Sequence, residues 1–267
     1  MKNNVMDLDL SGRRALVCGA SKGIGLAAAR ALASLGAEVT LAARTEETLQ
    51  SALAGLDTAQ EQQHGILAVD FSDTAALQKA LAEHMKGRGH YHILVNNSGG
   101  PAAGQAILAE PEDYLKAFTQ HLVANQVVTQ ALADGMKKEG YGRIVNVIST
   151  SVKQPIKGLG VSNTVRGAVA NWAKTLAGEL GAYGITVNNV LPGATDTDRM
   201  AEIIAGKAGR TGQSQEEVKA AEVAKIPAGR FAQPAETGAA IAFLCSPAAA
   251  YINGVNLPVD GGRTACL

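Results

Sequence analysis

Short apolar runs alternate with longer stretches of helical periodicity along most of the chain. Residues 14–18 (RALVC) form a compact apolar run that ends at Gly19, which is typical of a strand buried on both faces. Residues 24–35 show apolar positions three and four apart and stop before Gly36, as expected of a helix. The pattern predicts further strands at 38–42, 65–69, 93–96, 143–148, 186–191 and 255–259, and helices at 46–56, 72–86 (with Ser72 as N-cap), 110–138, 167–183 and 235–245.

Repeated strand–helix alternation predicts an α/β fold: a Rossmann-type, doubly wound parallel sheet of about seven strands with helices on both faces. Such a sheet binds ligands beyond the carboxyl ends of its strands, where the strand order reverses. Residues 1–267 are expected to form a single domain. Residues 200–224 are polar and dotted with glycine, which fits either a linker or a mobile lid; their place after a strand end favours the lid.

Charge and composition narrow the function classes. The 24 basic residues balance the 24 acidic ones, so no broad basic surface exists for nucleic acid or anionic lipid. Three cysteines, Cys18, Cys245 and Cys266, occur without a CxxC pair or a histidine cluster, which predicts neither a disulfide framework nor a metal site. The first ten residues carry Asp7 and Asp9, unlike a signal peptide. We expect a soluble, cytoplasmic protein.

A glycine-rich segment (GASKGIG) joins the first predicted strand to the first predicted helix. Gly19 permits a sharp turn, Gly23 lets the backbone approach a pyrophosphate, and Gly25 allows close packing of helix on strand. No Gly-Lys-Ser/Thr follows, which excludes a nucleoside-triphosphate P-loop. A simple tight turn is the structural alternative. The candidate phosphate-binding residues are Gly19, Ser21, Lys22, Gly23, Ile24 and Gly25.

The end of the second predicted strand bears on the choice of nicotinamide cofactor. An acidic residue there would bind the ribose 2′-hydroxyl of NAD, whereas an arginine accommodates the 2′-phosphate of NADP. The chain has Arg44 at this place and no acid before Glu46, and Lys22 adds a second cation. These residues favour NADP(H), with NAD(H) as the alternative. Both cations could also be ordinary solvated surface charges.

The chain resembles the classical short-chain dehydrogenase/reductase family, most closely its 3-oxoacyl-(acyl carrier protein) reductase-like members. The resemblance extends over roughly residues 10–263. It rests on the glycine loop, Asp70, the NNSG sequence at 96–99, GRIVN at 142–146, the Pro-Gly pair at 192–193, Thr197, Gly254 and the DGG sequence at 260–262.

The resemblance implies a contact surface for each part of the dinucleotide. Structural alternatives exist, since Asn97 can stabilise a turn and the Pro-Gly pair at 192–193 can simply end a strand. The implied residues are Asp70 and Phe71 at the adenine; Asn97, Ser98 and Gly99 along the adenosine; and Pro192, Gly193, Thr195 and Thr197 at the nicotinamide end.

The catalytic positions of the family are altered in this sequence. The family uses a serine that polarises the carbonyl, a tyrosine that transfers the proton, and a lysine four residues later that binds the ribose and lowers the tyrosine pKa. Ser149 matches the serine, but Ser162 stands at the tyrosine position and Arg166 at the lysine position. A supporting asparagine of the family falls at or beside Gln120.

These replacements change the chemistry. The Ser162 hydroxyl is a far weaker acid than a phenol, and loss of a positioned general acid typically costs about 10²- to 10⁴-fold in rate. Arg166 keeps a positive charge and hydrogen-bond donors for a ribose. Water, Lys153 or Lys157 could supply the proton instead, although loop lysines are more often solvated charges. His121 is a further titratable residue, expected on a helix face packed against a neighbour.

Two functions therefore stay open. The first is an NADP(H)-dependent oxidoreductase of a small carbonyl or alcohol substrate with non-standard proton delivery. The second is an inactive dinucleotide-binding protein that acts as a regulator or as the non-catalytic subunit of a mixed oligomer. The resemblance also implies a homodimer or homotetramer built from the helices at 110–138 and 167–183, or a hetero-oligomer with an active relative.

Overall fold

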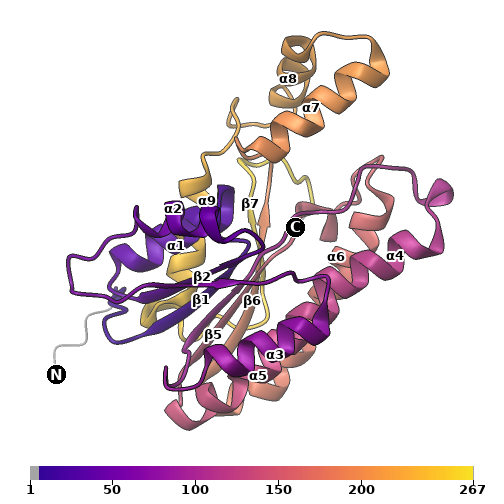
Figure 1. The fold of residues 1–267 in the computed structure, drawn as a ribbon. Coiled ribbons are helices and arrows are strands. Elements are labelled where there is room, and N and C mark those ends of the chain that lie inside the picture. Colours follow the sequence, from indigo (N-terminus) through magenta and orange to yellow (C-terminus); the bar gives the residue numbers. More distant parts are fainter. Residues whose placement is uncertain (1–5, 267) are drawn as a thin grey trace.

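Seven parallel strands form one sheet in the order β3-β2-β1-β4-β5-β6-β7 (Figure 1). The predicted doubly wound parallel fold is confirmed, and the strand order reverses between β1 and β4. The computed structural model describes residues 6–266, so part of the predicted 1–267 domain and of the N-terminal segment lies outside the described residues. The strands are β1 (Arg14–Cys18), β2 (Glu38–Ala43), β3 (Gly65–Ala68), β4 (Ile93–Asn96), β5 (Gly142–Val147), β6 (Ile185–Pro192) and β7 (Asn256–Val259).

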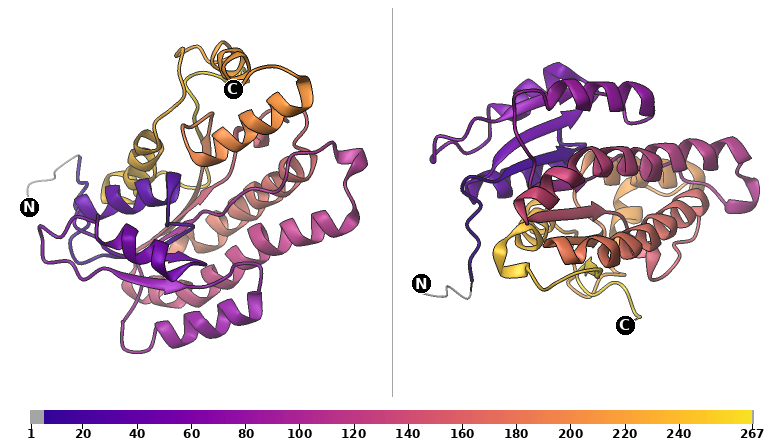
Figure 2. Two further views of the ribbon diagram at one scale, coloured as in Figure 1. Left: turned by 45° about the horizontal axis from the view of Figure 1, so that its top comes forward. Right: turned by 90° about the horizontal axis from the view of Figure 1, so that it is seen from below.

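Helices cover both faces of the sheet (Figures 1 and 2). On one face α1 packs against α9, with α2 beside them, and on the other face α3, α5 and α6 lie together. Within residues 6–266, no helix is both long and apolar enough to cross a membrane. The helices are α1 (Gly23–Ser34), α2 (Glu46–Leu53), α3 (Thr74–His84), α4 (Pro111–Phe118), α5 (Ala124–Glu139), α6 (Gly160–Leu180), α7 (Asp198–Thr211), α8 (Gln215–Val223) and α9 (Pro234–Cys245).

The alternation of side chains along β1 explains how one strand serves two cores. Ala15 and Val17 belong to the cluster under α1 and α9, whereas Leu16 and Cys18 belong to the cluster under α3, α5 and α6. All four are almost fully buried. A strand covered on both faces needs apolar residues at every position, which is why its sequence shows no polar alternation.

A row of asparagines crosses the second half of the sheet. Asn96 donates to Asn146 over 2.9 Å, Asn146 donates to Asn189 over 2.9 Å, and Asn189 donates to Asn256 over 2.8 Å. The four residues are paired in register on β4, β5, β6 and β7. Each inner amide donates to one neighbour and accepts from the other, so buried polar side chains are accommodated inside a parallel sheet.

Several predicted boundaries are wrong. The helix predicted at 110–138 is interrupted by a π-helical turn, Thr119–Val123, between α4 and α5. Helix α6 begins at Gly160, seven residues before the predicted start, because Val161 and Val165 pack against Ala117 of α4. The N-cap of α3 is Asp73, whose carboxylate accepts from the backbone N–H of Ala76, and not Ser72.

Candidate functional site

The glycine loop lies at the reversal point of the strand order, where β1 and β4 end side by side. Gly19 has a φ of +58°, and a Cβ there would lie 2.6 Å from the backbone oxygen of Asn97. Asn97 in turn donates through Nδ2 to the carbonyls of Cys18 (3.3 Å) and Gly19 (3.1 Å). A Cβ at Gly25 would collide with the carbonyl oxygen of Gly19. Only glycine therefore fits at these two positions, and Asn97 fastens the loop to β4.

The start of α1 is suited to hold an anionic group. Lys22 is the N-cap residue, but its side chain makes no capping hydrogen bond, and the first turn of α1 contains no acidic residue. The N–H groups of a helix start that lack such a cap remain available, and the helix dipole favours an anion beside them. Gly23 adopts a φ of +59°, which leaves its backbone open to close approach. This loop fits a dinucleotide pyrophosphate.

The residues predicted at the adenosine end lie at the carboxyl ends of β2 and β3. Arg44 is exposed just beyond β2, and Phe71 is buried after β3. Asp70 accepts hydrogen bonds from the backbone and hydroxyl of Ser72, both 2.8 Å, and these, with the charge of Arg44, lower the pKa of Asp70. Asp70 is therefore a carboxylate at neutral pH and can accept from an amino group.

A buried cation lies at the ends of β4 and β5. Arg166 donates from Nη1 to the backbone oxygen of Val147 (3.2 Å) and from Nη2 to that of Ser98 (3.5 Å). Its residue surface is only 8% exposed, and burial lowers its pKa to about 10, so it stays charged at neutral pH. Within residues 6–266 no carboxylate lies within ion-pair distance of it. A buried guanidinium held by two carbonyls alone retains unused N–H donors for a ligand.

Ser149 and Ser162 belong to the two elements that meet at this cation, the end of β5 and helix α6. Ser149 follows β5 and accepts a hydrogen bond from the backbone N–H of Ser151 over 3.1 Å, so its own hydroxyl proton is free to be donated. Ser162 lies one turn before Arg166 on α6, on the same helix face. Both serines are partly exposed. Lys153 and Lys157 follow Ser149 on the loop, the first partly and the second fully exposed.

His121, directly beside Gln120 on the π-helical turn, contacts this cluster through Ser98. Its Nδ1 lies 2.6 Å from the hydroxyl oxygen of Ser98, and its ring is 1% exposed. Burial, together with the charge of Arg166, lowers the pKa of His121 to about 3, so the imidazole is neutral. Its Nε2 has no hydrogen-bond partner among the described residues. The π-helical turn, a feature frequent at functional sites, could not be read from the sequence.

The residues predicted at the nicotinamide end follow β6. A Cβ at Gly193 would lie 2.7 Å from Cα of Asp260, so the chain crosses here at close range. Thr195 is buried, and Thr197 is the N-cap of α7, accepting from the backbone N–H of Met200 over 3.4 Å. Pro192 ends β6.

The expected lid region is helical. Residues 200–224 fall mainly on α7 and α8, which stand above the sheet in Figure 1. Their small core contains Ile204, Ala208 and Val218. Glu222 forms ion pairs with Lys207 (2.8 Å), Lys225 (2.7 Å) and Arg263 (3.1 Å). The segment is thus a packed helical pair joined to the C-terminal residues.

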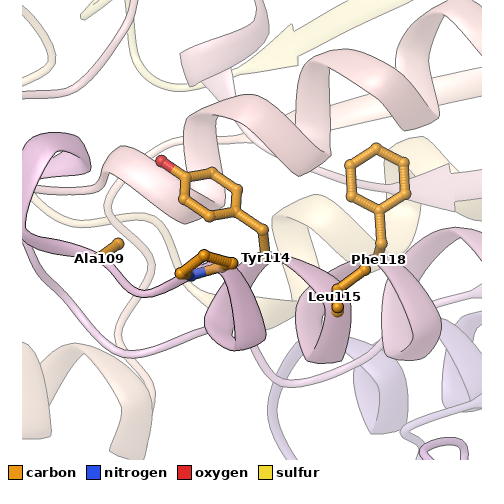
Figure 3. A pocket seen from close by; sticks show the side chains of 5 residues that line it. Ala109, Tyr114, Leu115 and Phe118 are labelled. Atoms are coloured by element: carbon orange, nitrogen blue, oxygen red, sulfur yellow. The ribbon is translucent and has the colours of Figure 1, made fainter.

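An apolar hollow of about 680 Å³ lies along α4 (Figure 3). Tyr114 and Phe118, one turn apart, point in the same direction from the helix, and Leu115 is 67% exposed. The other lining residues are Ala109 and Pro111. Tyr114 donates to the backbone oxygen of Ala106 over 3.4 Å. The hollow contains no charged lining residue, which separates it chemically from the cluster around Arg166.

Comparison with known proteins places this geometry in a family. A family model described as enoyl-(acyl carrier protein) reductase matches residues 19–264. The chain is 34% identical over 258 residues to gluconate 5-dehydrogenase of Gluconobacter oxydans, covering 97% of each. It is 32% identical to the 3-oxoacyl-(acyl-carrier-protein) reductase of Vibrio cholerae, over 96% of this chain and 98% of that one.

A solved structure agrees with these relatives. L-sorbose reductase from Gluconobacter frateurii, complexed with NADPH and L-sorbose, matches with a TM-score of 0.91 and 29% identity. The match covers 98% of this chain and 100% of that one. The chain belongs to the short-chain dehydrogenase/reductase family of NAD(P)-dependent oxidoreductases, whose members act on CH–OH and carbonyl groups.

Proposed function

We propose that the protein is an NADP(H)-dependent oxidoreductase that moves hydride between nicotinamide and a carbonyl or alcohol. The observation that carries this proposal is the buried Arg166, which has spare donors and bonds to the end of β5, the strand that Ser149 follows. Leaving a buried charge so incompletely bonded is costly, so an oxygen-rich ligand is the natural partner of this site. The ribose of a dinucleotide whose phosphates bind at the glycine loop would supply those oxygens.

The choice of NADP(H) rests on charge. Arg44 follows the end of β2 and Lys22 belongs to the glycine loop, and no acidic residue stands at the end of β2 to bind a 2′-hydroxyl. NADPH is also the cofactor in the matched L-sorbose reductase structure. NAD(H) is the alternative. When bound, the cofactor donates or accepts the hydride. The residues that would hold it are Gly19, Ser21, Lys22, Gly23, Ile24, Gly25, Arg44, Asp70, Phe71, Asn97, Ser98, Gly99, Arg166, Pro192, Gly193, Thr195 and Thr197.

The residues around the substrate oxygen would stabilise negative charge without a phenol. Ser149 would donate its free hydroxyl proton to the carbonyl oxygen as a hydrogen bond. Arg166 would add its positive charge while binding the ribose, since preorganised donors and charges stabilise a developing oxyanion. Ser162 is too weak an acid to replace tyrosine. Water, Lys153 or Lys157 would then supply the proton, and in the reverse direction accept it.

The test begins with binding. Thermal stability of the purified protein should rise with NADPH concentration, and rise less with NADH. Turnover should then be sought with ketoses, aldonic acids and 3-oxoacyl thioesters, the substrate classes suggested by the names of its relatives. Ser149→Ala should keep NADPH binding and lose at least about 100-fold in kcat. Absence of hydride transfer across this panel, with NADPH bound, would contradict an independent enzyme.

Ser162 favours a second candidate, a non-catalytic dinucleotide-binding protein. Such a protein would regulate, or support, an active relative in a mixed oligomer. Affinity purification from its own cells distinguishes the two: an active family member recovered in stoichiometric amount supports the second candidate. Robust turnover by the isolated chain contradicts it.

Assembly and compartment complete the proposal. The apolar hollow on α4 and the exposed Leu115, Ile107 and Leu108 offer a surface for a homodimer or homotetramer (Figure 3). Light scattering during size-exclusion chromatography checks this. All three cysteines are free thiols, as is usual for a protein of the reducing cytoplasm, the compartment that we propose.

A further inference from the structure

An ion pair links the glycine loop to the first residue of α7. Lys22 Nζ lies 2.7 Å from Oδ2 of Asp198, across 176 positions in the sequence. The hydrogen bond from Lys22 and the charge of Lys22 lower the pKa of Asp198, which is therefore ionised at neutral pH. Each side chain is 69% exposed, so water can replace either partner and the pair can open readily.

Asp198 places its carboxylate beside Lys22, at the start of α1. The start of α7 lies close over the start of α1, since a Cβ at Gly23 would be 3.5 Å from the Thr197 methyl carbon. Lys22 provides a cation here, and the first turn of α1 has no acid of its own. A carboxylate from a distant helix thus occupies Lys22 at a place that favours anions.

We propose that Asp198 is a specificity-determining residue that competes with the 2′-phosphate of NADP(H) for Lys22. The inference rests on the proposed function, which places the cofactor at the glycine loop. To bind the 2′-phosphate, Lys22 must leave Asp198, and the two anions then repel each other. NAD(H) carries a hydroxyl at this position, so it leaves the Lys22–Asp198 pair in place. Asp198 therefore lowers the preference for NADP(H) below the level that Lys22 and Arg44 alone would provide.

Other contacts keep α7 in place when Lys22 leaves. Arg199 donates to the backbone oxygen of Pro101 over 2.9 Å and pairs with Glu202 over 3.3 Å. Thr197 caps the helix through its own hydroxyl. Lys22 can consequently leave Asp198 for the 2′-phosphate by a movement of its own side chain, without unfolding of α7.

The decisive measurement is the dissociation constant of the full-length protein for NADPH and for NADH, at low ionic strength. Asp198→Asn should tighten NADPH binding about two- to five-fold, the range of an exposed ion pair, and leave NADH within about two-fold. Glu216→Gln is the matched control, because it removes an exposed acid of α8 that forms no ion pair among the described residues. It should leave the NADPH/NADH ratio unchanged.

A double-mutant cycle isolates the competition. In a Lys22→Met background, which itself should weaken NADPH selectively, Asp198→Asn should no longer affect the NADPH/NADH ratio. The adenosine fragments 2′,5′-ADP and 5′-AMP provide a second readout that needs neither nicotinamide nor turnover, and 2′,5′-ADP alone should gain affinity in Asp198→Asn.

The outcomes separate this inference from the proposed function. Tight NADPH binding with an unchanged ratio in Asp198→Asn, or an equal effect in the Lys22→Met background, would overturn the role of Asp198 alone. Failure of the wild-type protein to bind either dinucleotide would overturn the proposed function and this inference together.

Discussion

Arg166 donates to the backbone oxygen of Val147 across 3.2 Å, so a guanidinium carried by α6 ends at the tip of β5. The same group reaches the carbonyl of Ser98 at the tip of β4. Backbone oxygens at two strand ends thus fix the plane of one cation. Arginine is suited to this position because its planar fork can use two backbone acceptors and still offer donors to a ligand.

Restoring the family's tyrosine and lysine tests whether the replacements at Ser162 and Arg166 alone limit the rate. Ser162→Tyr combined with Arg166→Lys should raise the reductase rate about 10²- to 10⁴-fold, because a phenol beside an ammonium can transfer a proton near neutral pH. Steady-state assays with NADPH and a responsive substrate measure the change. Each single variant serves as a control and should gain less than the pair. A double variant that binds NADPH yet remains no faster would place the difference elsewhere in the site.

The altered site should also change the pH profile of turnover. His121 has its pKa lowered to about 3 and Arg166 keeps a pKa of about 10, so neither changes charge between pH 5.5 and 9. If water delivers the proton, kcat should vary less than about two-fold over this range. Initial rates at saturating NADPH check this. A sigmoidal or bell-shaped profile would instead indicate a titrating donor, and its loss in Lys153→Met or Lys157→Met would identify the residue.

Neutral His121 makes the fold sensitive to acid. Burial lowers its pKa from 6.5 to about 3, so the unfolded chain binds the extra proton at a higher pH than the folded one. The stability from this residue is complete above about pH 6.5 and is lost as the pH falls towards 3. Between pH 7 and pH 5 the wild type should lose about 2 kcal/mol through this group. Urea titrations should show that His121→Asn removes that part of the loss; an equal loss in both proteins would contradict it.

Glu222 should hold the α7–α8 pair to the C-terminal residues. Its burial would raise the pKa, but hydrogen bonds from Lys207 and Lys225 outweigh burial and lower it to about 2. Glu222→Gln should speed hydrogen exchange across 198–224 at pH 7, with a local loss of about 1 to 3 kcal/mol. Glu216→Gln, on the same helix but exposed, is the control. Because the folded pKa is lowered, the wild-type advantage should fade as the pH drops from about 4.5 through 2.

The order of strands and helices was predictable because each buried strand reads as an apolar run that ends at a turn. The glycine loop was predictable for a related reason, since Gly19 and Gly25 stand where any Cβ would meet backbone. For Gly25 that backbone belongs to the loop itself, and for Gly19 it belongs to Asn97 on the neighbouring strand end. Both positions exclude every side chain, so the glycines themselves are visible in a single sequence.

Tertiary contacts explain what the sequence pattern missed. The first turn of α6 contains Ser162, Asn163 and Thr164, weak helix formers, and depends on packing of Val161 and Val165 against α4. The π-helical turn that buries His121 likewise left no pattern in the sequence. Helix α8 does carry a local signal, because Ser214 and Glu217 form a capping box at its start.

The asparagines in the row across β4 to β7 depend on one another for their hydrogen bonds. Replacing Asn146 alone by leucine would leave Nδ2 of Asn96 without its acceptor and Oδ1 of Asn189 without its donor. Substituting one asparagine of the row by an apolar residue should therefore destabilise the fold, whereas replacing all of them together would leave no unpaired amide. Asn96 is followed directly by Asn97, which fastens the glycine loop, and Asn256 lies at the outer edge of the sheet. A slip of one of these strands by a residue would break the side-chain bonds of the row, so the row favours a single alignment of β4 to β7.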